Sequence, residues 1–148
     1  TTTDFASSSY VIDQSYIQRG LARNEDEFYT LTGKELSLIW HAPYYRTSKI
    51  ITTASANAGY TLIEPTIKPL DTLSIETAAK SGTIYLSSGK MVEAITAALK
   101  PGSVIPVSTG INLGTRTDYL YEDLDLLLSA ILEAGYEIVP VTELYRWK

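Results

Sequence analysis

Cysteine is absent from this chain of 148 residues, and histidine occurs once, as His41. The lack of cysteine excludes disulfides, thiolate metal sites and cysteine nucleophiles, and one histidine excludes a metal site that needs several from the same chain. No apolar run approaches the roughly 18 residues of a membrane-spanning helix, so we expect no membrane span. No segment resembles a signal peptide, and because the chain begins at Thr1 we expect a mature or trimmed product.

Positive charge is also scarce. The chain has 12 Lys and Arg against 17 Asp and Glu, which gives a net charge of −5. Nucleic-acid binders and proteins drawn to anionic membranes carry basic surfaces, so we expect neither partner. The hydrophobic content of 45% and the charged content of 20% are ordinary for a globular domain. Eleven tyrosines and two tryptophans suit the binding of sugar rings, although tyrosine is equally common in cores and interfaces.

Apolar periodicity and turn residues predict helices that alternate with short strands. Such alternation with short links predicts parallel strands joined by right-handed crossovers, in a single domain spanning residues 1–148. The expected helices cover 10–32, 47–58, 71–79, 90–99 and 119–134. The expected strands cover 36–40, 60–64, 103–107 and 136–141, with a strand or extended loop at 83–86, a Gly-containing loop at 109–117 and a turn or short helix at 142–148.

Some positions in these helices carry specific predictions. Either Asp71 or Thr72 is expected to cap the helix over 71–79. In the second helix Ile50, Ile51 and Ala54 are expected to point inward. The last long helix is expected to bury six side chains, namely Leu120, Leu124, Leu127, Leu128, Ile131 and Leu132.

Residues 36–47, LSLIWHAPYYRT, combine a short apolar run with a turn rich in polar and aromatic side chains. A strand that delivers such side chains at its carboxyl end is typical of active-site edges in α/β proteins. His41, Tyr44, Tyr45 and Arg46 are therefore candidate ligand-binding residues. A plain structural interpretation stays open, in which the strand leaves the core through a proline-marked turn and Arg46 makes a surface ion pair. Trp40, as a strand residue, is expected to face the core.

Several short segments occur in the order and spacing of one protein family. Residues 41–44 read H-A-P-Y, where that family has R-x-P-Y at a strand end, and Asp71 opens a segment where it has D-x-x-D-W. Residues 100–103 read K-P-G-S before a predicted strand, and 135–144 follow the pattern G-Y-x-x-V-x-x-x-E-L. The chain thereby resembles the C-terminal part of the polysaccharide deacetylase domain, the NodB-homology domain of carbohydrate esterase family four.

This resemblance implies a fold and a chemistry. The implied fold is α/β: a partial or distorted (β/α) barrel with mostly parallel strands and helices outside, here lacking the family's first strand. Family members hydrolyse N-acetyl groups on glycans with a divalent metal such as zinc, held by one aspartate and two histidines. The resemblance also implies an extracellular, periplasmic or cell-envelope location.

The chain departs from the family at its catalytic positions. The strand with the metal-binding and base aspartates has no counterpart, and the two metal histidines correspond to positions near Thr2 and Ala6. Ser108 stands in place of the late-strand histidine, and His41 in place of an arginine. Of the later acidic motif only Asp71 remains. We therefore expect no metal or other cofactor in this chain and no family-type catalysis by it alone.

Seven residues are candidates for ligand binding, and none is assigned a catalytic role, although three occupy family-equivalent positions (His41, Asp71 and Ser108). Asp71 is expected either to bond a sugar hydroxyl or to cap its own segment. The seven candidates are His41, Tyr44, Tyr45, Arg46, Asp71, Ser108 and Thr109.

Three functional hypotheses stay open. The first is a polysaccharide deacetylase-like domain without turnover that binds glycan or serves as a structural or interaction module. The second is a portion of an active carbohydrate N-deacetylase, completed by a missing segment or by a partner across an open sheet edge. The third is a different hydrolase that uses His41, Asp71 and Ser108 in the same cleft.

Overall fold

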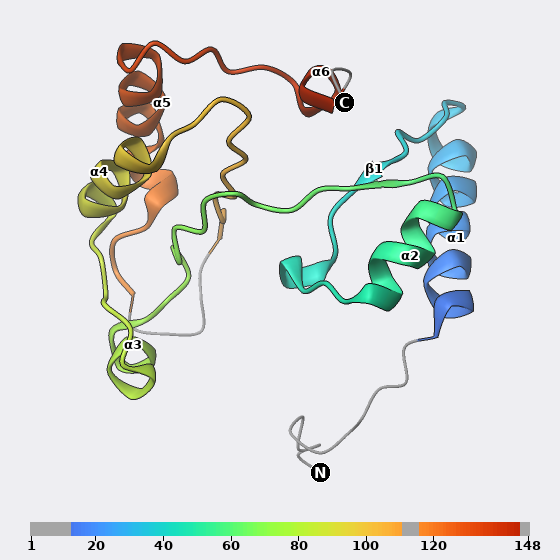
Figure 1. Cartoon of the computed structure of the whole chain (residues 1–148), viewed down its shortest axis with the longest axis horizontal. Helices are drawn as coiled ribbons and strands as arrows, with labels where there is room; N and C mark the ends of the chain where they lie inside the picture. The colour runs from blue at the N-terminus through green and yellow to red at the C-terminus, as the bar shows by residue number, and fades with distance from the viewer. Residues whose placement is uncertain (1–12, 111–115, 146–148) are drawn as a thin grey trace. The chain divides into compact units, whose positions relative to one another are not determined.

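The computed structural model describes residues 13–110 and 116–145 (Figure 1). The chain divides into two compact units, the first ending at Glu64 and the second beginning at Pro65. Helices predominate among the described residues, and their sheet consists of two short parallel strands. The general α/β class expected from the sequence is therefore present, whereas the barrel and the single domain stay predictions.

The first helix, α1, spans Gln14–Thr32. It begins where the Asp13 side chain accepts a hydrogen bond from the Tyr16 amide at 2.7 Å, and it ends at Gly33 in the left-handed conformation. The helix predicted over 10–32 is confirmed from Gln14 onward, while residues 10–12 lie outside the described part of the chain. Ile17 and Leu21, one turn apart, are buried, so this face of α1 supplies the core of the first unit.

The second helix, α2, spans Lys49–Asn57 and packs against α1. Ser48 caps its first turn, and Gly59 follows its end with a positive φ. Ala54 and Ile51 lie against the core as expected, but the prediction for Ile50 is wrong, because its side chain is exposed. Neighbouring residues of an α-helix point about 100° apart, so Ile50 lies outside the narrow buried stripe that contains Ile51.

The two strands are β1, Ile39–Trp40, and β2, Thr61–Leu62, both shorter than predicted. They are parallel, with Ile39 opposite Thr61 and α2 between them in sequence, so the expected parallel pairing is confirmed. Hydrogen bonds from the Thr61 amide to Leu38 and from the Ile63 amide to Trp40, both 2.8 Å, hold the register. This β–α–β segment places the turn after β1 at the strand's carboxyl end.

The second unit contains α3 (Ile75–Ser81), α4 (Ser88–Ala98), the 3₁₀ turn η2 (Leu120–Asp123), α5 (Leu124–Glu133) and α6 (Val141–Leu144). Its core lies where α4 contacts η2 and α5. The short helix expected near the C-terminus is present as α6, and residues 111–115 and 146–148 lie outside the described part. The buried core side chains are Met91, Val92, Ile95, Leu120, Leu127 and Ile131.

The strands predicted over 103–107 and 136–141 are wrong, because residues 103–107 and 136–140 pair in no sheet and Val141 begins α6. The first makes isolated bonds: the Thr66 amide donates to the Val104 carbonyl at 3.0 Å, and the Val104 amide donates to the Thr66 hydroxyl at 2.8 Å. Pro106 and Pro140 lack an amide donor, which weakens continuous pairing in each segment. The stretch 83–86 likewise forms no strand.

The prediction for the last long helix is half right. Leu120, Leu127 and Ile131 are buried, but Leu124, Leu128 and Leu132 are exposed. The helix begins with the 3₁₀ turn η2, whose tighter winding changes the phase of the following residues. The three buried side chains therefore form one stripe that faces α4, and the three exposed leucines lie on the stripe beside it. No helix in the described residues has the length and apolar character needed to cross a membrane.

Candidate functional site

The turn after β1 has an unusual backbone. In η1, Pro43–Tyr45, both Tyr44 and Tyr45 adopt positive φ angles, 54° and 53°. This left-handed conformation costs a residue with a side chain roughly 1–2 kcal/mol. The turn is closed by the Tyr45 amide donating to the Ala42 carbonyl at 2.8 Å and by the Arg46 amide donating to the Pro43 carbonyl at 3.2 Å. Strained backbone of this kind occurs preferentially at binding and catalytic sites.

The aromatic candidates of this turn differ in their surroundings. His41 and Tyr45 stack on each other, with ring centroids 4.7 Å apart and an interplanar angle of 28°. Tyr44 is 90% exposed and contacts neither ring. The stack occupies one face of His41 and Tyr45, so Tyr44 is the ring of this turn that is free to stack on a ligand.

A groove of about 650 Å³ lies between α1 and this turn. Two of the predicted residues, Tyr44 and Arg46, line it, whereas His41 and Tyr45 do not. Trp40 lines it too, while packing against the core as the sequence predicts. Its indole N–H is buried without a hydrogen-bond partner among the described groups. The remaining lining residues are Tyr16, Ile17, Gly20, Leu21, Arg23, Asn24, Glu27, Ala42, Pro43 and Ile51.

Sequence reasoning missed the contribution of α1 to this groove. Arg23 and Glu27 form an ion pair across one helical turn, with Nε and Oε1 2.8 Å apart, and Asn24 lies beside them. Nothing in the residues themselves distinguishes this pair from an ordinary exposed i, i+4 pair. The position of this ion pair near Tyr44 depends on the packing of α1 against α2, which the sequence does not show.

The second unit brings Asp71 and Ser108 together. Asp71 is 7% exposed, and its carboxylate accepts two hydrogen bonds, from the Ser108 amide at 2.6 Å and from the Ser108 hydroxyl at 3.3 Å. The prediction that Asp71 or Thr72 caps the next helix is wrong, because Ser74 caps α3 by accepting from the Thr77 amide at 3.2 Å. Asp71 instead ties together two segments far apart in sequence.

A buried arginine, which sequence reasoning also missed, organises the neighbouring loops. Arg116 is 3% exposed, and its guanidinium donates to the carbonyl oxygens of Asp118 at 2.7 Å, Leu73 at 3.0 Å and Leu86 at 2.9 Å. Its Cζ lies 4.7 Å from the ring centre of Tyr85. Such bonds satisfy backbone carbonyls that no strand or helix pairs, so this cluster is structural in character.

The Asp118 carboxylate completes this cluster. It accepts hydrogen bonds from the Tyr85 hydroxyl and from the Ser88 amide, the latter at 2.8 Å, and lies 3.7 Å from Arg116. Burial would raise the pKa of Asp118, but these hydrogen bonds and the Arg116 charge outweigh it and lower that pKa below its usual value. The hydrogen bond to Asp118 raises the pKa of Tyr85, aided by burial.

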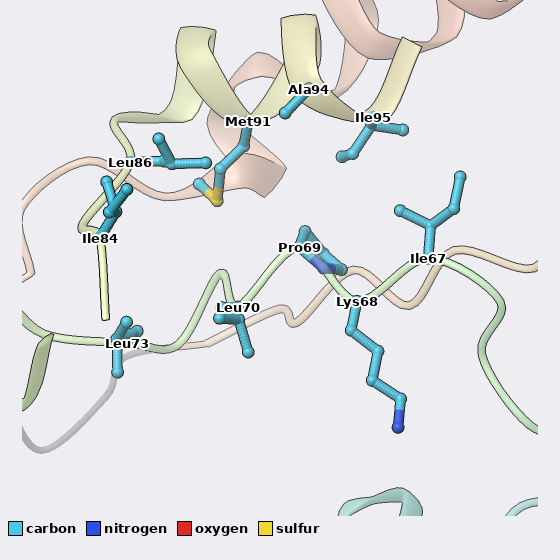
Figure 2. A pocket seen from close by; sticks show the side chains of 10 residues that line it. All are labelled: Ile67, Lys68, Pro69, Leu70, Leu73, Ile84, Leu86, Met91, Ala94 and Ile95. Carbon is cyan, nitrogen blue, oxygen red and sulfur yellow. The ribbon is translucent and has the colours of Figure 1, made fainter. Parts of the chain in front are cut away.

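A cavity of about 220 Å³ lies beside α4 in the same unit (Figure 2). Met91 and Ile95 close it on the helix side, and Ile67 and Pro69 approach from the loop. The Lys68 side chain points away from it (Figure 2). The cavity is thus apolar and offers no group for catalysis.

The predicted site residues fall into the two units. His41, Tyr44, Tyr45 and Arg46 belong to the first, and Asp71, Ser108 and Thr109, an exposed neighbour of Ser108, belong to the second. Residues 13–110 and 116–145 contain no group of three His, Cys, Asp or Glu side chains arranged to hold a metal ion. The positions near Thr2 and Ala6 lie outside the described residues.

Comparison with models of known protein families and with curated proteins gives no match to this chain.

Proposed function

We propose that this chain is a polysaccharide deacetylase-like domain that binds a glycan without hydrolysing it. The observation that carries the proposal is the groove beside the turn after β1, which is lined by the exposed ring of Tyr44, by Arg46 and by Trp40. Aromatic faces beside polar groups suit a sugar, which has apolar ring faces and hydroxyl edges.

The contact between Asp71 and Ser108 supports the family part of the proposal. The resemblance expects these two positions to line one cleft, and they are hydrogen-bonded although 37 residues separate them. The parallel β1–α2–β2 segment is the repeating unit of a (β/α) barrel. We propose on these grounds a partial barrel of the deacetylase type, and from the family resemblance we propose that it acts outside the cell or in its envelope.

The absence of turnover is argued from the residues that hold the family's catalytic positions. A serine hydroxyl cannot act as a general acid near neutral pH, so Ser108 cannot replace the histidine that protonates the leaving amine. The Asp71 carboxylate is occupied by the amide and hydroxyl of Ser108. This pair therefore does not supply the general acid that the family's reaction needs.

The test is a calorimetric titration of the protein with chito-oligosaccharides and with peptidoglycan fragments. Binding without release of acetate is the expected result, and Tyr44→Ala should weaken binding about fivefold, since a stacked ring contributes on the order of 1 kcal/mol. Tyr29→Ala is the matched control, because Tyr29 is exposed on α1 but does not line the groove. Failure to bind any of these glycans would leave only a structural or interaction role.

A second candidate is a portion of an active metal-dependent deacetylase. The observation that favours it is the two-stranded sheet of the first unit, because parallel strands normally lie within larger sheets that another strand could complete. Acetate release from chito-oligosaccharides with added zinc or cobalt would support this candidate. Binding with no acetate release under the same conditions would remove it.

A further inference from the structure

The groove between α1 and the turn after β1 carries one uncompensated positive charge. Its charged lining residues are Arg23, Glu27 and Arg46. Arg23 and Glu27 neutralise each other at 2.8 Å. Arg46 is exposed and forms no ion pair with any side chain in residues 13–110 and 116–145, so its guanidinium is available to a ligand.

The rest of the groove supplies apolar and aromatic surface. Tyr16 and Tyr44 are both largely exposed, and Trp40 and Ile51, which also line the groove, pack against the core. The volume of about 650 Å³ falls within the range of about 300–1,000 Å³ of small-molecule sites. A ligand that fits must therefore pair a flat apolar face with an anionic group.

We propose that this groove binds an acidic sugar unit of a glycan, with the sugar's carboxylate on Arg46 and its ring face on Tyr44. The proposal rests on the glycan-binding function proposed above and adds the chemical class of the ligand. The planar guanidinium matches a carboxylate through two parallel hydrogen bonds, whereas a neutral sugar offers it only hydroxyls. A polyanion is otherwise repelled by a protein with a net charge of −5, so a local positive charge decides where it binds.

Two kinds of sugar carry such a carboxylate: hexuronic acids, on the ring itself, and muramic acid, through its lactyl ether. Calorimetric titration at about 50 mM salt with three probes separates them. The probes are a neutral chito-oligosaccharide, an oligogalacturonate and a peptide-free peptidoglycan glycan strand. We expect at least one acidic probe to bind about fivefold or more tightly than the neutral probe.

Variants locate the charge effect. Arg46→Gln should reduce the affinity for the acidic probe to that for the neutral one, and Arg46→Lys should retain part of the difference because it keeps the charge but not the fork. Lys34→Gln removes one charge from the same unit outside the groove and should leave the difference intact. Folding of each variant is checked by circular dichroism.

The outcomes separate the two proposals. Equal binding of neutral and acidic probes, unchanged by Arg46→Gln, would overturn the acidic-sugar proposal and leave glycan binding in place. The acidic-sugar proposal would also be overturned if Lys34→Gln reduced the difference in affinity between acidic and neutral probes as much as Arg46→Gln does. The preference for acidic probes would then come from the net charge of the protein. Binding of none of the probes would overturn both proposals.

Discussion

The two units use their polar side chains in opposite ways. In the first, the turn after β1 holds Tyr44 and Arg46 at the surface on a strained backbone. In the second, Asp71 and Arg116 are buried, and each makes several hydrogen bonds within the unit. Groups already satisfied within the fold stabilise it, whereas exposed groups on a strained turn are available to a ligand. We therefore propose that the first unit carries the binding surface and that the second gives structural support.

The largest expected effect comes from removing the buried arginine. Arg116→Met should lower the free energy of unfolding of the second unit by about 2–4 kcal/mol, because three carbonyl oxygens lose a charged donor. Urea unfolding followed by amide hydrogen exchange measures this for each unit. Arg19→Met, which removes an exposed arginine from α1, is the control and should cost well under 1 kcal/mol. A loss below 1 kcal/mol for Arg116→Met would contradict the structural role.

The next largest effect concerns stability and compares the two hydrogen bonds that the Asp71 carboxylate accepts. Asp71→Ala removes both acceptors and should cost about 1–3 kcal/mol, whereas Ser108→Ala removes only the hydroxyl bond at 3.3 Å and should cost about 0.5 kcal/mol. Chemical denaturation of both variants provides the comparison. If Asp71→Ala weakens glycan binding while leaving stability unchanged, the residue belongs to the binding site and the contrast between the units fails.

A smaller effect tests the strain at the turn. Tyr44→Gly should raise the free energy of unfolding by about 0.5–1 kcal/mol, because glycine adopts the positive φ of 54° without steric cost. The same variant should lose glycan affinity, since it lacks the ring. Thermal unfolding and calorimetric titration test these two effects. Tyr29→Gly, within helix α1, should instead lower the free energy of unfolding by about 0.5 kcal/mol. Destabilisation by Tyr44→Gly would show that the turn is not strained.

The smallest effect is a pH dependence of the second unit. The folded-state pKa of Asp118 lies below its usual value of 3.8, so its stabilising contribution is present above that value and is lost as the pH falls through the lower, folded pKa. The folded-state pKa of Tyr85 lies above 10.0, so its contribution is present below pH 10 and is lost as the pH rises further. Asp118→Asn should flatten the acid limb of the stability profile. An unchanged acid limb in Asp118→Asn would show that other carboxyl groups cause the loss.

The sequence predicts helix ends better than it predicts strands. Gly33 and Gly59 mark helix ends because their positive φ is a local property of the chain. Strands depend on a partner elsewhere, so an apolar run such as 103–107 can equally become an extended loop. The leucines of α5 were placed wrongly for another reason: the 3₁₀ turn η2 at the start of this helix changes which side chains face the core.

The candidate site was predictable in part. The exposed aromatic turn after β1 follows from the proline and tyrosines of residues 43–45, which the sequence shows directly. The groove needed the packing of α1 against α2, which brings Arg23 and Asn24 beside Tyr44. The Arg116 cluster rests on bonds to carbonyls of distant loops, and no local residue pattern encodes such bonds.

We propose that the turn after β1 and its groove bind a glycan that the protein does not cut. This is tested by two-dimensional NMR of the labelled protein, titrated with the neutral and acidic oligosaccharides while acetate is followed in the same tube. We expect shifts confined to residues 40–46 and the adjoining face of α1, with no acetate produced. Shifts centred on Asp71 and Ser108 together with acetate release, or no shifts at all, would contradict it.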